Sequence, residues 1–216
     1  MRVLVLGAGA VGGYFGARLT EGGHDVTFVA RGDNLDALRR DGLTVRLADR
    51  TMHLSPVHAV REPADAPRPA LVLVCVKSHD TPAAAAALRP VVSADTIVLS
   101  LQNGIENEES IARELAIPPL MVACTRIGVA LVAPATIEYS GRGTIVFGEV
   151  DGRESPRARQ VAATLAAAGV PMSRRLRRRH RLHETSTRIG RDGRPGPAAR
   201  QPTVHDFPDP GPVADR

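Results

Sequence analysis

The chain has 216 residues and a formal net charge of +5, and it is long enough to bury a hydrophobic core. The charge is uneven, because residues 1–172 contain 17 Lys+Arg against 18 Asp+Glu, whereas residues 173–216 contain 11 against 5. The basic excess belongs to the C-terminal segment, which argues against a nucleic-acid-binding protein as a whole, and no apolar run reaches the roughly eighteen residues of a membrane span.

The first elements predict alternating strands and helices. Residues 2–6 form a continuous apolar run that is too short for a helix, which indicates a strand buried on both faces. We expect helices at Tyr14–Glu21 and Asn34–Arg40, and strands at Asp25–Ala30, Leu43–Leu47 and Met52–Leu54. Asp33 is predicted to cap the second helix, and the last two strands are predicted to form a hairpin around Asp49 and Arg50.

The middle of the chain continues this alternation. Ala70–Val76 is the most apolar strand, and Thr81–Leu88 contains five consecutive alanines, the strongest helix formers. A strand at Thr96–Leu101 and a helix at Ile105–Leu115 follow. Strand and helix repeat in units of about thirty residues, which predicts an α/β fold with a Rossmann-type doubly wound parallel sheet.

After Pro118 and Pro119 the pattern changes to strands separated by short turns. We expect strands at Leu120–Val132, Thr136–Tyr139 and Thr144–Gly148, and hence an antiparallel extension of the sheet. A final helix, Pro156–Ala168, is predicted to be capped by Ser155 and ended by Gly169. These elements assign residues 1–172 to one domain.

Residues 173–216 have a different composition. They contain six prolines, four glycines and eleven arginines, and too few large apolar residues to offset the entropy cost of ordering the segment. We therefore expect a disordered tail at 173–216.

A glycine-rich motif follows the first strand directly. Residues 7–12 read GAGAVG and match G-x-G-x-x-G between a strand and a helix. In that motif the first glycine allows a tight turn, the second lets the backbone approach a pyrophosphate, and the third lets the helix pack on the strand. The phosphates would bind free N–H groups at the helix N-terminus. The alternative is an ordinary strand-to-helix turn built from small residues.

Arg31 stands nineteen residues after Gly12, where NAD-specific proteins place an acid against the ribose hydroxyls. A guanidinium can make a bidentate contact with a 2′-phosphate, so the sequence favours NADP(H) over NAD(H). Asp33 lies near enough to oppose this charge, and a solvated surface arginine is the alternative.

Two further polar residues follow the next two strands. Lys77, at the end of the most apolar strand, is the one lysine among 28 basic residues, and Asn103 follows the strand after it. Open parallel sheets bind ligands at the carboxyl ends of their strands, so the glycine loop, Arg31, Lys77 and Asn103 should face one crevice. Chance could also explain the single lysine, and Asn-Gly is a common turn. His79 and Asp80 are expected to be a solvated loop and a helix cap rather than a catalytic pair.

These ordered motifs resemble the ketopantoate reductase family, also called 2-dehydropantoate 2-reductase. GAGAVG, Arg31, VKS, LQNG and a strand pair ending in IVFG occur in the family's order, over about residues 1–172. The resemblance implies NADPH-dependent reduction of 2-dehydropantoate to (R)-pantoate in pantothenate biosynthesis. It also implies cofactor-binding roles for the following residues: Gly7, Ala8, Gly9, Ala10, Val11 and Gly12 at the pyrophosphate, Arg31 at the 2′-phosphate, Lys77 and Asn103 near the nicotinamide, and Gly128 through its backbone.

The family continues into a helical second domain that supplies a lysine as general acid, and the sequence departs from that pattern. Lys77 is the only lysine, and arginine cannot replace a proton donor. No catalytic residue is therefore assigned.

Two alternative functions remain open beside a ketopantoate reductase. One is a non-catalytic NADP-binding module, and the other is a related 2-hydroxyacid or nucleotide-sugar dehydrogenase. The tail is interpreted as the product of a reading-frame change near Met172, with a basic RNA-binding arm at 174–181 as the competing interpretation.

The remaining expectations concern cysteine chemistry and location. Cys75 and Cys124 lie in apolar runs, which is typical of buried thiols in a reducing compartment. The N-terminus lacks the pattern of a signal peptide, so a cytoplasmic location is expected. We expect no metal site and no membrane partner. The family resemblance implies a small 2-keto acid as substrate. The sequence does not predict the oligomeric state.

Overall fold

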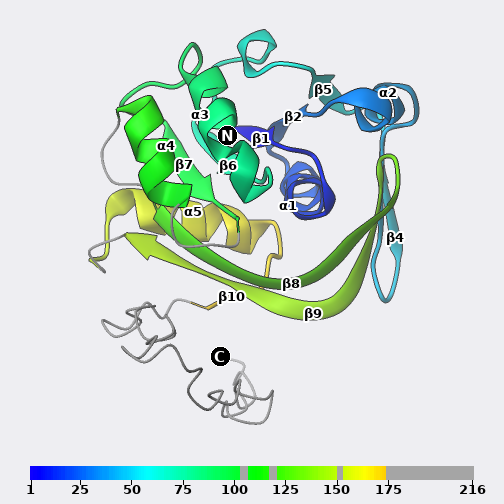
Figure 1. Ribbon diagram of the computed structural model, residues 1–216. Helices are drawn as coiled ribbons and strands as arrows, with labels where there is room; N and C mark the ends of the chain where they lie inside the picture. Colours follow the sequence, from blue (N-terminus) through cyan, green and yellow to red (C-terminus); the bar gives the residue numbers. More distant parts are fainter. Residues whose placement is uncertain (103–106, 117–120, 150–152, 174–216) are drawn as a thin grey trace, which may run out of the picture. The chain divides into compact units, whose positions relative to one another are not determined.

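The fold is that of a computed structural model, which describes residues 1–102, 107–116, 121–149 and 153–173 (Figure 1). Within these residues, ten strands form one sheet in the order β4-β3-β9-β8-β7-β6-β1-β2-β5, with β10 paired to β9. The strands are β1 (Arg2–Leu6), β2 (Asp25–Val29), β3 (Leu43–Arg46), β4 (Thr51–Leu54), β5 (His58–Val60), β6 (Leu71–Val74), β7 (Ile97–Ser100), β8 (Met121–Ala133), β9 (Thr136–Glu149) and β10 (Met172–Ser173). The α-helices are α1 (Ala10–Glu21), α2 (Gly32–Asp41), α3 (Thr81–Leu88), α4 (Asn107–Leu115) and α5 (Pro156–Ala167), and two short 3₁₀ turns lie at Pro63–Asp65 and Ser78–Asp80.

Six neighbouring strands are parallel and form the centre of the sheet. They run β5-β2-β1-β6-β7-β8, and the register pairs Val5 with Phe28 on one side and with Leu73 on the other. β9 is antiparallel to β8, and β4 is antiparallel to β3. The predicted parallel sheet, its antiparallel extension and the β3–β4 hairpin are therefore confirmed.

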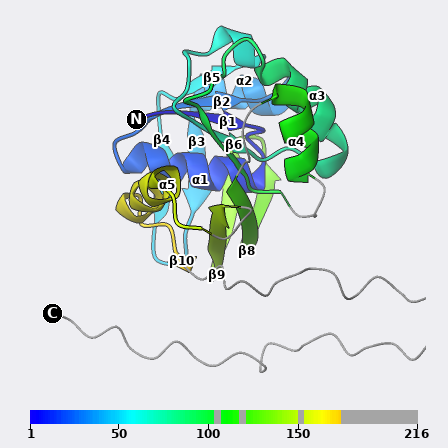
Figure 2. The same cartoon turned by 90° about the vertical axis from the view of Figure 1, so that its left-hand side faces the viewer.

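The sheet is covered on both faces, as a doubly wound fold requires. Val3 and Val5 of β1 join a core with Phe15 of α1 and Leu165 of α5, whereas Leu4 and Leu6 join a second core with Leu88 of α3 and Ile111 of α4. The alternation of side chains along a strand explains why one five-residue segment contributes to both cores. Figure 1 shows the long β8–β9 hairpin curving around α1, and Figure 2 shows α1 beside α5.

Three local predictions were wrong. The first helix begins at Ala10 rather than Tyr14, because the glycine loop itself supplies the first turn. Asp33 does not cap α2: it lies in the first turn, the N-cap position is Arg31, and no side chain caps this end. The predicted break at 140–143 is absent, because Gly141 and Gly143 adopt φ values of +75° and +127° within the continuous strand β9. β5 and β10 were not predicted; both are short strands.

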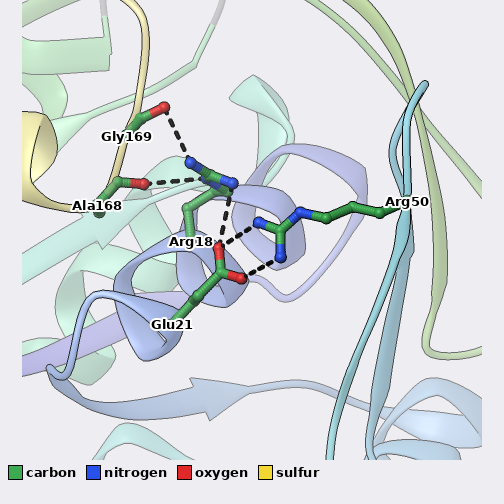
Figure 3. A network of polar contacts seen from close by, with 5 residues as sticks. All are labelled: Arg18, Glu21, Arg50, Ala168 and Gly169. Carbon is green, nitrogen blue, oxygen red and sulfur yellow. Dashed lines mark hydrogen bonds and ion pairs between the residues drawn. The ribbon is translucent and has the colours of Figure 1, made fainter.

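A polar cluster joins segments that lie far apart in the chain (Figure 3). Arg18 of α1 donates through Nε to the carbonyl of Ala168 at 3.0 Å and through Nη2 to that of Gly169 at 3.1 Å, just beyond α5. It also pairs with Glu21 at 3.2 Å, and Arg50 of the β3–β4 connection makes a bidentate pair with Glu21 at 2.6 and 2.8 Å. The cluster therefore connects α1, the end of α5 and the β3–β4 hairpin.

Two further findings hold for the part of the chain that the structure describes. None of its helices has the length and apolar character needed to cross a bilayer. His, Cys, Asp and Glu side chains do not gather there in groups of three that could bind a metal ion.

Candidate functional site

The turn between β1 and α1 is held against the neighbouring strand. Gly7 has a φ of +99°, and a Cβ there would stand 3.0 Å from the backbone nitrogen of Val76. The N–H groups of Gly7 and Ala8 both donate to the carbonyl of Val29 at the end of β2, at 3.2 and 3.0 Å. The turn therefore has a fixed position beside the carboxyl ends of β2 and β6.

Helix α1 begins with N–H groups that precede its first internal hydrogen bond. That bond runs from the N–H of Gly13 to the carbonyl of Gly9 at 2.8 Å, so the amides of Ala10, Val11 and Gly12 come before it. A Cβ at Gly12 would overlap the carbonyl oxygen of Gly7, whereas a Cβ at Gly9 would meet no atom within 4 Å. The helix end is thus packed on its strand at Gly12 and open at Gly9, where an anion can approach it.

A cavity of about 440 Å³ lies at this edge of the sheet. It is lined by residues of the glycine loop, of the segment after β2 and of the segment after β6, namely Gly7, Ala8, Gly9, Arg31, Asn34 and Lys77, with the alanine face of α3 on one side. The structure therefore brings together the glycine loop, Arg31 and Lys77.

The other predicted site residues have different positions. Ala10, Val11 and Gly12 belong to the first turn of α1 and are not part of the cavity wall. Gly128 is an exposed residue of β8 whose carbonyl accepts a bond from Ser140 at 3.2 Å, away from the cavity lining. Asn103 lies outside the described residues.

The cavity presents two cations to solvent. Arg31 and Lys77 are exposed, and neither forms an ion pair with a described residue. The walls around them are largely apolar, which strengthens electrostatic attraction compared with open water. The site is therefore suited to an anionic ligand.

His79 and Asp80 also line the cavity. Their side chains are exposed and lie 3.4 Å apart, from Nε2 to Oδ2. Asp80 occupies the N-cap position of α3 as predicted, but its side chain makes no capping hydrogen bond. Nothing in this geometry singles out the pair as catalytic.

Sequence reasoning missed Asn34, which lies on α2 and at the cavity wall. Its Nδ2 donates to the carbonyl of Ala8 at 2.8 Å, and its Oδ1 accepts from the N–H of Ala135 at 2.8 Å. These partners are 26 and 101 residues away in the chain, so no local pattern could have indicated the contact.

A buried polar group supports the segment that bears Lys77. Gln102 donates through Nε2 to the carbonyl of Val76 at 2.8 Å and to Oγ1 of Thr81 at 2.7 Å, and Thr81 donates to Oδ1 of Asn107 at 3.1 Å. Gln102, Thr81 and Asn107 are all at most 5% exposed. The ends of β6 and β7 and the starts of α3 and α4 are thereby joined.

Cys75, which lines the cavity, is a free thiol. Burial raises its pKa far above the usual range, so it stays protonated at neutral pH. It therefore contributes a small apolar surface rather than a nucleophile, as predicted. The side chain of Cys124 lies outside the described part of β8.

A parallel sheet covered on both faces, with a G-x-G-x-x-G turn leading from its first strand into a helix, places this chain among the Rossmann-type α/β proteins. The family described as Ketopantoate reductase PanE/ApbA matches residues 3–152, and the chain belongs to this family.

Known relatives support this assignment. The chain is 36% identical over 169 residues to the 2-dehydropantoate 2-reductase of Archaeoglobus fulgidus, and 33% identical over 171 residues to that of Halobacterium salinarum. These matches cover 78% and 79% of this chain, and 54% and 56% of the relatives. The crystal structure of a PanE/ApbA family ketopantoate reductase from Ralstonia eutropha has a TM-score of 0.73 and 34% identity, over 80% of this chain and 56% of that one. The chain thus spans about half the length of the relatives that it matches.

Proposed function

We propose that this chain binds NADP(H) in the cavity at the carboxyl edge of the sheet, as the cofactor-binding part of a 2-dehydropantoate 2-reductase. The observation behind the proposal is that one cavity contains the glycine loop, Arg31 and Lys77. Family membership indicates the reaction, which reduces the ketone of 2-dehydropantoate to the alcohol of (R)-pantoate.

The residues present fit this cofactor. The open side of Gly9 and the early amides of α1 suit a pyrophosphate, because they offer donors at the positive end of the helix without an obstructing side chain. Arg31 at the N-cap of α2 suits a 2′-phosphate, because its planar guanidinium can donate two parallel hydrogen bonds. Lys77 places a second cation in the lining of the same cavity.

NADPH, when bound, supplies the hydride for the reduction. In this proposal the residues of the chain bind and orient the dinucleotide, and no residue is assigned as the donor of the proton for the product alcohol. Lys77 is the only lysine, and the guanidinium of arginine does not release a proton near neutral pH.

A titration tests cofactor binding and preference together. We expect saturable binding of NADPH, tighter than that of NADH, and we expect Arg31→Ala to lower the preference by about tenfold or more, since a hydrogen bond to a charged group is being removed. Arg159→Ala, an exposed arginine on α5, serves as the matched control and should leave both affinities unchanged. No saturable binding, or a preference that survives Arg31→Ala, would refute the proposal.

The alternative is a non-catalytic NADP(H)-binding module, which would use the same cavity. The absorbance of NADPH in the presence of 2-dehydropantoate separates the two functions, because only a complete reductase consumes the cofactor.

Three expectations from the sequence stay predictions: the domain division at residue 172, a cytoplasmic location and the nature of residues 173–216. RNA binding that falls with salt and is lost on truncation after Met172 would favour the basic-arm interpretation of that segment.

A further inference from the structure

Asn34 connects three parts of the protein through one amide group. It lies on α2, three residues after Arg31, and it bonds both to the glycine loop at Ala8 and to the β8–β9 turn at Ala135. An asparagine is suited to this position because its amide nitrogen donates a hydrogen bond and its amide oxygen accepts one. The two bonds, each 2.8 Å long, fix which way the amide is oriented.

The bond to Ala8 determines the direction of a neighbouring N–H group. In a trans peptide the C=O and the following N–H point in opposite directions. Since Asn34 holds the carbonyl of Ala8 toward α2, the N–H of Gly9 must point away from α2. Gly9 lines the cavity, and the space at its Cα is open.

The bond to Ala135 keeps the amide of Asn34 in place. The carbonyl of Ala135 accepts a bond from the N–H of Thr44 in β3 at 2.9 Å, so the turn is itself anchored to the sheet. Ala135 is 4% exposed and has a φ of +52°, and its N–H donates to Oδ1 of Asn34. The anchored turn therefore holds the side-chain amide of Asn34 in place. Asn34 in turn holds the carbonyl of Ala8 in the glycine loop.

We propose that Asn34 is a positioning residue for dinucleotide binding, which sets the Ala8–Gly9 peptide plane so that the Gly9 N–H faces the pyrophosphate. This inference rests on the proposed function. Because the pyrophosphate is common to NADP and NAD, loss of Asn34 weakens both ligands to the same extent. Loss of Arg31, in contrast, changes the preference between them.

Asn34→Asp provides a test with a distinctive pH dependence. The variant keeps the shape and the acceptor for Ala135, but an ionised carboxylate places a second acceptor against the carbonyl of Ala8. A protonated carboxyl can again donate to Ala8, so acid restores the original pair of bonds. Titrations use the full chain with NADP⁺ and NAD⁺ at pH 7.5 and pH 5, each compared with the wild-type chain at the same pH.

We expect Asn34→Asp to bind both nucleotides about tenfold more weakly than wild type at pH 7.5, with a smaller deficit at pH 5. Asn34→Ala should be weaker at both pH values by a similar factor for both nucleotides. Arg39→Leu is the matched control, because Arg39 lies on the same helix and donates to a backbone carbonyl, that of Ala59, away from the glycine loop. It should bind as wild type does.

The outcomes separate the possible failures. If wild type shows no saturable binding, the proposed function fails first. If wild type binds and Asn34→Ala binds equally well with a lower melting temperature, Asn34 is only structural and the inference is overturned. Should Asn34→Asp not fold at pH 7.5, Asn34→Ala, which adds no charge, decides the question.

Discussion

Gly9 and Gly12 lie in the same turn, but their surroundings differ. At Gly12 an added methyl group would overlap the backbone of Gly7 and come within 3.0 Å of Cys75, so the helix would have to move away from β1. At Gly9 the same methyl group would meet no atom within 4 Å and would stand at the cavity wall. One glycine is therefore needed for packing, and the other for ligand access.

This contrast predicts opposite results for two alanine variants. Gly9→Ala should change the free energy of unfolding by no more than about 1 kcal/mol and weaken NADPH binding strongly, because the methyl group occupies the approach to the helix N-terminus. Gly12→Ala should lower the free energy of unfolding by about 2 kcal/mol or more through steric overlap. Denaturant unfolding and NADPH titration measure both quantities. Equal stability losses in the two variants would contradict the assignment.

The positions of some residues at the cavity could be predicted from the sequence. The glycine motif, Arg31 and Lys77 each follow a strand directly, and the rule that parallel strands end at one edge was enough to bring them together. Asn34 could not be found in this way, because its partners at Ala8 and Ala135 become neighbours only when the β8–β9 hairpin folds back on the sheet.

At the scale of elements, polar side chains at the N-terminus of α5 form hydrogen bonds with the end of β9. The Oγ of Ser155 accepts from the N–H of Ala158 at 3.1 Å, as predicted, and donates to Oε1 of Glu149 at 2.5 Å. Nε of Arg157 donates to the same carboxylate at 2.6 Å. A carboxylate near a helix N-terminus is also favoured by the helix dipole.

Removal of the cap should weaken α5 without affecting the cavity. We expect Ser155→Ala to lower the free energy of unfolding by about 1 kcal/mol, which is typical of a lost N-cap. Ser155→Asp is the informative companion, because it can cap the helix but places a second carboxylate beside Glu149. It should recover less stability at pH 7 than at pH 4. Chemical denaturation at the two pH values checks both expectations.

The pair of Glu149 and Arg157 predicts a pH dependence of stability. The hydrogen bond from Arg157 lowers the pKa of Glu149 below its usual value of 4.5, against the opposing effect of burial. Its contribution to stability is therefore complete above about pH 5 and is lost as the pH falls through the lowered pKa in the folded state.

Glu149→Gln should reduce the free energy of unfolding at pH 7 by about 1 kcal/mol, and the difference from wild type should shrink below pH 4. Glu154→Gln is the control, because Glu154 is 69% exposed and 3.9 Å from Arg159. Its unfolding curve should match wild type at every pH. A Glu149→Gln deficit that persists at pH 3 would argue against the ion pair as its origin.

The strands show where local patterns fail. β6 and β7 were predicted within a few residues because continuous apolar runs are typical of a sheet covered on both faces. β9 was predicted as two strands, because Gly141 and Gly143 are typical of a turn. In the structure β9 is continuous, because its residues before and after these glycines pair with β8. β5 has three residues, too few for a pattern, and it forms because it lies against β2.

At the scale of the whole molecule, a polar cluster connects α1 to the segment just after α5, and the contact from Arg18 to Ala168 spans 150 residues of chain (Figure 3). The cluster consists of Arg18, Glu21, Arg50, Ala168 and Gly169. Arg18 is 16% exposed and contributes its guanidinium to two backbone carbonyls and one carboxylate. Gly169 has a φ of +64°, and a Cβ there would overlap Nη2 of Arg18, so the glycine that ends α5 also allows this approach.

Arg18→Met keeps most of the aliphatic packing and removes the charge and all three contacts. We expect it to lower the free energy of unfolding by about 2 kcal/mol, because it leaves the partly buried carbonyl of Ala168 without its donor. Arg40→Met is the matched control: Arg40 pairs with Asp41, but the two side chains are 70% and 57% exposed, so its loss should leave the free energy of unfolding unchanged. Equal effects of the two variants in urea denaturation would mean that the cluster adds no more than a surface ion pair. A selective loss for Arg18→Met would show that the contacts of Arg18 contribute to holding the end of α5 against α1.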